Sequence, residues 1–236
     1  MEEEELIDFA EIDAMRREAD RHLQELAGAR LPEWSEHSAL AGHMTPCPFL
    51  GTEIPWGELF YPCCGDDIGH ALQVFGPYVS RCRFADVFKP AGHRPKFRSH
   101  TSGKGLPHIG TVICGEEASK DLEGYPLPVT SHRKDGLLTF LQDLGPLAVF
   151  YYRGDSAGEG GSDQRWLMPV LLDVILSRLL EGGLICTDGA NGDDLLVHSP
   201  RGTVLDYRGR KLTCIATDLP GGDGRGPLKI WRLTGA

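Results

Sequence analysis

The chain has 236 residues, of which 41% are hydrophobic and 25% are charged, and its formal net charge is -10. These proportions are ordinary for a globular protein, and the acidic balance argues against nucleic acid as a partner, because broad electrostatic binding needs a basic face. The acidic start (Met-Glu-Glu-Glu-Glu) is unlike a signal peptide, and no apolar run is long enough to span a membrane, so we expect a cytoplasmic protein.

The N-terminal quarter of the chain predicts one helix followed by an irregular segment. Apolar residues recur at spacings of three and four over residues 8–28, which is typical of an amphipathic helix. Residues 29–57 are rich in proline, and we expect them to wrap the core without regular structure.

From residue 58 onward, short apolar runs alternate with helix-like segments. Strands are predicted over 59–61, 81–87, 125–132, 147–152 and 184–187, and helices over 68–78, 137–144 and 166–180. Gly182 and Gly183 suit the C-terminal cap of the last helix, and residues 89–124 are predicted to form a long loop, with a short strand at 111–114. Four short strands separated by turns follow, over 195–198, 203–206, 211–217 and 228–233.

This order predicts an α/β fold of the Rossmann-like type, in which a mostly parallel sheet has helices on both faces and ends in a C-terminal antiparallel hairpin. We expect a single domain over residues 1–236. Residues 1–57 would form its N-terminal helical extension and wrapping segment, and residues 58–236 its α/β core.

Acidic residues recur at the ends of the predicted strands. Asp66 and Asp67 follow the first strand, Asp86 follows the second, and Asp155 and Asp188 follow the fourth and fifth. Because parallel strands end at one edge of a sheet, these carboxylates would converge there, where they could accept hydrogen bonds from ribose, bind Mg²⁺ or act as general bases. Each aspartate taken alone could equally be a turn or helix-cap residue.

In the order of its elements, the chain resembles the class I S-adenosylmethionine-dependent methyltransferases over roughly residues 58–233. The segment Tyr61-Pro-Cys-Cys-Gly-Asp-Asp67 stands where that family has its glycine-rich loop after the first strand. The resemblance therefore implies that Tyr61, Cys63, Gly65 and Asp67 contact the cofactor. The segment departs from the family pattern in having one glycine, two adjacent cysteines and two acids, and residues 89–124 are a long insertion.

The same resemblance assigns further residues to the site. Asp86 stands where the family's acid holds the ribose diol, and Asp135 stands where an acid often contacts the adenine amine. Arg153 and Asp155 follow the fourth strand, a position often used for the substrate or for catalysis. The implied mechanism is in-line methyl transfer to a nucleophile held near Arg153 and Asp155, with Asp155 as the base.

The resemblance thus implies a methyltransferase that uses S-adenosylmethionine and acts on a small-molecule or protein acceptor. No metal site is expected, since the cysteines and histidines lack the usual ligand spacing. One alternative is a Mg²⁺-dependent enzyme for a phosphorylated substrate, which would use Asp66, Asp67, Asp86 and Asp188. Another is a non-catalytic binding or assembly protein on the same fold. No motif identifies the acceptor or the oligomeric state.

Overall fold

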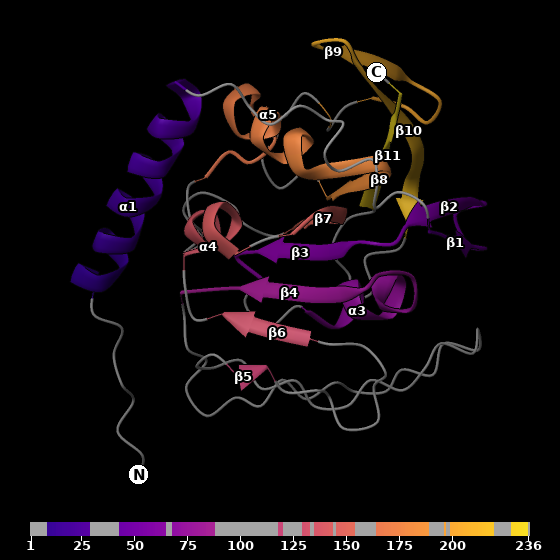
Figure 1. Cartoon of the computed structure of the whole chain (residues 1–236). Helices are drawn as coiled ribbons and strands as arrows, with labels where there is room; N and C mark the ends of the chain where they lie inside the picture. Colours follow the sequence, from indigo (N-terminus) through magenta and orange to yellow (C-terminus); the bar gives the residue numbers. More distant parts are fainter. Residues whose placement is uncertain are drawn as a thin grey trace. The chain divides into compact units, whose positions relative to one another are not determined.

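The computed structural model describes residues 9–28, 43–64, 68–87, 118–119, 129–132, 135–143, 145–153, 164–188, 196, 199–219 and 228–235. These residues form two compact units, and each is described by itself. Unit 1 consists of the described residues within 1–30, 61–77 and 81–144, and unit 2 of those within 31–60, 78–80 and 145–236. Figure 1 shows the elements of both units.

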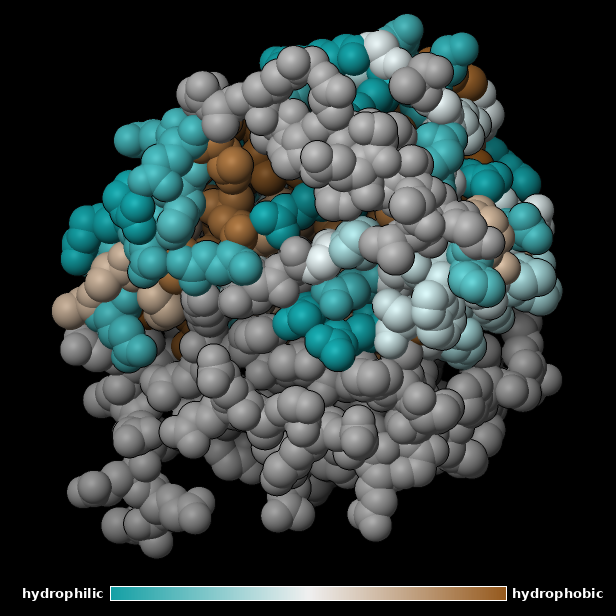
Figure 2. All heavy atoms as spheres, viewed as in Figure 1, coloured by the Kyte–Doolittle hydropathy of each residue, from teal (hydrophilic) through white to brown (hydrophobic). Residues whose placement is uncertain are grey.

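Unit 1 combines three helices with a small sheet. Its helices are α1 (Phe9–Gly28), α3 (Ile68–Phe75) and α4 (Gly136–Asp143), and its strands are β4 (Arg81–Ala85), β5 (Ala118–Ser119) and β6 (Val129–His132). Strands β4 and β6 pair in parallel and β5 is antiparallel to β6, while α1 lies beside α4 (Figure 1). The side of α1 seen in Figure 2 is mostly hydrophilic, whereas Ile12 and Ala19 of this helix are buried.

Unit 2 is built around a larger sheet. Its elements are β1 (Met44–Cys47), β2 (Thr52–Pro55), β3 (Glu58–Pro62), β7 (Leu147–Tyr152), α5 (Pro169–Arg178), β8 (Leu179–Thr187), β9 (Val204–Tyr207), β10 (Arg210–Leu219) and β11 (Leu228–Thr234). Strands β3, β7 and β8 are parallel neighbours in that order, and β11, β10 and β9 continue the sheet with antiparallel pairing. Every residue of β7 is buried, as is typical of a parallel strand covered on both faces. The last two residues of β3, Tyr61 and Pro62, fall within the residue range of unit 1.

The strand order within each unit matches part of the Rossmann arrangement. In chain order, β3, β4, β6, β7 and β8 are the first to fifth parallel strands. Unit 1 places the third beside the second, and unit 2 places the first, fourth and fifth in succession. The Rossmann order begins 3-2-1-4-5, and these are its two segments. The predicted mixed α/β class with mostly parallel core strands and a closing antiparallel hairpin is confirmed at this level.

Two local predictions were wrong. The proline-rich segment contains the β1–β2 hairpin, in which Met44 lies opposite Pro55. Proline is tolerated there because a two-stranded sheet consists only of edge strands. The predicted cap of the last helix is also absent, since α5 ends at Arg178 and Leu179 is already extended, with φ -74° and ψ 124°.

Gly182 and Gly183 serve β8 instead. Gly182 has φ +79°, a conformation that favours glycine, and it lies where the register between β7 and β8 is irregular. A Cβ atom on Gly183 would come within 2.7 Å of the carbonyl oxygen of Leu180. The glycines therefore permit an irregularity inside a strand.

Some predictions fall on other parts of the chain. The strand predicted at 111–114 and the glycine-rich segment at 154–163 lie outside the described residues. The single domain over residues 1–236 remains a prediction. None of the described helices is both long and apolar enough to cross a membrane.

Candidate functional site

The carboxyl end of β3 and the elements that contact it in unit 1 form the candidate site, which we call the strand-end site. It comprises residues 61–64, 85–86 and 135–136. The buried ring of Tyr61 packs edge-on against Phe84 of β4, with ring centroids 6.3 Å apart. The backbone N–H of Cys64 donates to the carbonyl oxygen of Ala85 at 3.2 Å. These two contacts bring the turn after β3 to the end of β4, which Asp86 follows directly.

Cys63 begins this turn with an unusual backbone. Its φ is 51°, in the left-handed region that residues with a Cβ atom rarely adopt. Glycine adopts this conformation without steric cost, and a non-glycine residue pays about 1–2 kcal/mol. The chain therefore has, immediately after its first core strand, the backbone geometry that glycine normally provides, although the residue is cysteine.

The start of α4 is packed tightly against the same turn. A Cβ atom on Gly136 would lie 2.8 Å from Cβ of Pro62 and 3.4 Å from the backbone nitrogen of Cys63. Real Cβ contacts are longer, so only glycine fits here without movement of α4 or β3. The close approach places Asp135, which precedes Gly136, next to the end of β3.

Asp135 caps α4. Its Oδ1 atom accepts the backbone N–H of Leu138 at 2.9 Å, and its carbonyl oxygen accepts the hydroxyl of Thr139 at 2.9 Å. The side chain is buried, and this burial raises the pKa of the Asp135 carboxyl group above its ordinary value. The N–H groups of Leu138 and Leu137 and the charge of Arg16 lower the pKa, whereas the charge of Asp20 raises it.

The structure thus brings four of the sequence-predicted cofactor residues into one unit. Tyr61, Cys63 and Asp135 meet through the contacts around β3 and α4, and Asp86 follows Ala85 at the end of β4. The other two, Gly65 and Asp67, lie outside the described residues. Asp135 also has a role that the sequence prediction did not include, since it caps a helix.

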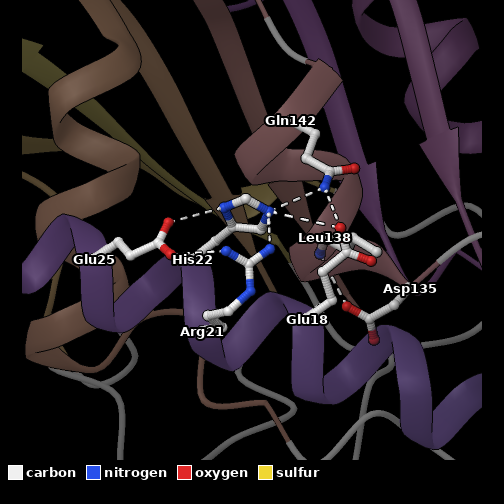
Figure 3. Close-up of polar contacts among 7 residues, drawn as sticks. All are labelled: Glu18, Arg21, His22, Glu25, Asp135, Leu138 and Gln142. Atoms are coloured by element: carbon white, nitrogen blue, oxygen red, sulfur yellow. Dashed lines mark hydrogen bonds and ion pairs between the residues drawn. The ribbon is translucent and has the colours of Figure 1, made fainter.

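The sequence prediction missed the part of α1 in this neighbourhood. Gln142 of α4 donates from Nε2 to Oε1 of Glu18 at 2.9 Å and lies 3.1 Å from Nε2 of His22 (Figure 3). Glu25 and Arg21 of the same helix surround the His22 ring. A capping aspartate ahead of a helix was a recognisable signal, but no local pattern could pair α1 with α4 across more than a hundred residues of sequence.

In unit 2, Arg153 and Asp188 follow the adjacent strands β7 and β8. Tyr152 lies opposite Thr187, so the next residue of each strand continues at the same level. Arg153 is wholly buried and its Nε lies 3.6 Å from Oδ2 of Asp188, whose side chain is 9% exposed. The guanidinium that the sequence predicted to bind substrate therefore faces a carboxylate of the chain itself. Asp155, the other predicted catalytic residue, lies outside the described residues.

The remaining candidate chemistry concerns metals and thiols. Within the described part of the chain, no group of three or more His, Cys, Asp or Glu residues is arranged to hold a metal ion. Asp66 and Asp67, on which the Mg²⁺ alternative depends, are outside it. Of the described cysteines, Cys63 is partly exposed and the others are buried. Burial raises the pKa of the Cys47 thiol to about 11, so this thiol remains protonated near neutral pH.

No protein-family model matches the sequence, and no curated protein matches it. Among solved structures, the chain is similar to a protein from Streptococcus mutans that is named a putative methyltransferase and was crystallised in complex with SAH. The TM-score is 0.39 and the sequence identity 12%, over 87% of this chain and 99% of that one. Similarity at this level has no bearing on the ligand of this chain, and the proposals below rest on its own residues.

Proposed function

We propose that the chain binds S-adenosylmethionine at the strand-end site of unit 1 and is a methyltransferase. The observation that carries this proposal is the left-handed backbone of Cys63, directly after a buried strand and tight against Gly136. A turn of this kind brings the backbone close to a ligand at the carboxyl end of a strand, which is where α/β sheets bind nucleotides. The resemblance in the order of elements points to the same position.

The described residues fit the polar groups of this cofactor. Asp86 follows the second core strand and is half-buried, so its carboxylate is suited to accept hydrogen bonds from a ribose diol. The carboxylate of Asp135 has about four lone-pair sites and uses some of them for the N–H groups that start α4. Its remaining acceptor capacity suits the adenine amine. Cys63 would line the methionine side of the site.

When bound, the cofactor supplies an electrophilic methyl group on a sulfonium sulfur. The tasks left to the protein are to bind, to orient the acceptor and to remove its proton, and orientation alone can supply most of the rate. The resemblance assigns these tasks to Arg153, which would bind an anionic group of the acceptor, and to Asp155, which would take its proton. This assignment rests on the sequence.

Calorimetric titration with S-adenosylhomocysteine tests the proposal. We expect saturable binding to the wild-type chain and an affinity about 10- to 100-fold lower for Asp86→Asn, because hydrogen bonds to a charged group contribute about 1.5–3 kcal/mol. Asp13→Asn is the matched control, since Asp13 is exposed on α1. An absence of binding at millimolar ligand, or an equal loss in both variants, would refute the proposal.

A further inference from the structure

The N-terminal helix α1 is fixed to α4, the helix that starts at the strand-end site. Gln142 makes the polar contacts to Glu18 and His22 that Figure 3 shows, and Ile12 and Ala19 of α1 are buried. A helix held by both apolar and polar contacts presents a defined face to its neighbour. The residues of α1 near the start of α4 are therefore held in place relative to Asp135.

Arg16 is the cation that this arrangement brings to Asp135. It follows Ile12 by four residues and precedes Ala19 by three, so it shares their buried face of the helix. Within the described part of the chain, its Nε atom is buried and has no hydrogen-bond partner. Placing a guanidinium donor out of water is costly unless an acceptor or an opposite charge compensates for it. The buried carboxylate of Asp135 carries that opposite charge.

We propose that α1 is part of the strand-end site and that Arg16 is a positioning residue that keeps the Asp135 carboxylate ionised and ready to accept a hydrogen bond from the ligand. The ligand part of this inference rests on the proposed function, whereas the coupling between Arg16 and Asp135 does not. A protonated Asp135 would lose its charge and part of its capacity to accept hydrogen bonds. The N-terminal helix would then control affinity through a residue that need not touch the ligand.

The groups that act on Asp135 are few and give opposite expectations. From α1, the positive charge of Arg16 lowers the pKa of the Asp135 carboxyl group and the negative charge of Asp20 raises it. From α4, the N–H groups of Leu137 and Leu138 lower it. At the end of β3, Cys63 is the titratable residue packed next to Gly136. Removing Arg16 should therefore move the titration of Asp135 to higher pH, and removing the charge of Asp20 should move it to lower pH.

The experiment is a pH titration of the Asp135 carboxyl carbon by ¹³C NMR in the full chain. Arg16→Gln should shift the titration midpoint upward, Arg16→Lys should restore most of the wild-type midpoint, and the exposed neighbour Arg17→Gln should leave it unchanged. Asp20→Asn should shift the midpoint downward. Because Asp20 is exposed, this variant tests the coupling even if Arg16→Gln fails to fold. A midpoint that does not respond to Arg16 or Asp20, or that responds equally to Arg17, would overturn the inference.

Binding of S-adenosylhomocysteine gives the second readout. Arg16→Gln should weaken binding several-fold at neutral pH, and the loss should shrink as the pH is raised and Asp135 ionises. A purely structural role for Arg16 predicts a loss that is the same at every pH, and that result would overturn the positioning role. Failure of the wild-type chain to bind would instead refute the proposed function, while the NMR titration would still decide whether α1 controls Asp135.

Discussion

Substitution of Gly136 by alanine should separate α4 from the end of β3. The new Cβ atom would lie 2.8 Å from Cβ of Pro62, about 1 Å closer than a normal carbon–carbon contact. The proline ring cannot rotate away, so the helix or the strand must move. Overpacking of this kind costs about 1–3 kcal/mol, and the higher helix propensity of alanine returns at most about 1 kcal/mol. We expect a net loss of about 1–2 kcal/mol in the free energy of unfolding.

Urea denaturation followed by circular dichroism measures this loss, with an unchanged dependence on urea expected if the denatured state is unaffected. Gly145→Ala is the matched control, because its Cβ atom would lie 3.5 Å from the carboxyl group of Glu58, an ordinary contact. We expect that variant to stay within about 0.5 kcal/mol of wild type. Gly136→Ala should also bind S-adenosylhomocysteine more weakly. A Gly136→Ala variant as stable as wild type, with unchanged affinity, would show that the close packing of α4 on β3 does not shape the site.

Three further substitutions follow from the described contacts. Asp135→Ala should lower the free energy of unfolding by about 1 kcal/mol in urea denaturation and Asp135→Asn by less, because an asparagine oxygen can still cap α4, and equal losses would argue against the cap. Cys63→Gly should raise the melting temperature slightly, since glycine adopts the left-handed backbone without strain, and a destabilised variant would contradict that conformation. Arg153→Met should cost about 3–5 kcal/mol by leaving the Asp188 carboxylate buried without its guanidinium. The double variant Arg153→Met, Asp188→Leu should recover much of this loss, and simple additivity in the double-mutant cycle would refute the pairing.

Local patterns predicted the elements whose burial is visible in the sequence. The apolar run at 147–152 became β7, every residue of which is buried, and the 3.6-residue period at 8–28 became α1. The pattern misled where backbone geometry depends on partners. Gly182 and Gly183 have the composition of a helix cap, yet they accommodate an irregular strand pairing that only the register with β7 reveals.

The site was predictable in position more than in detail. Asp86 and Asp135 were identified from the strand order, and the described contacts bring the ends of β3 and β4 and the start of α4 together. The left-handed backbone of Cys63 and the need for glycine at 136 could not be read from the sequence, because both arise from packing between distant segments. The pairing of Arg153 with Asp188 depends likewise on the alignment of two parallel strands.

The position of the ligand is the central claim, and chemical-shift mapping of the ¹⁵N-labelled chain with S-adenosylhomocysteine tests it most directly. We expect saturable amide shifts that cluster at residues 61–64, 85–87 and 135–138, the segments of the strand-end site. Shifts confined to unit 2, or an unchanged spectrum at millimolar S-adenosylhomocysteine, would contradict the claim.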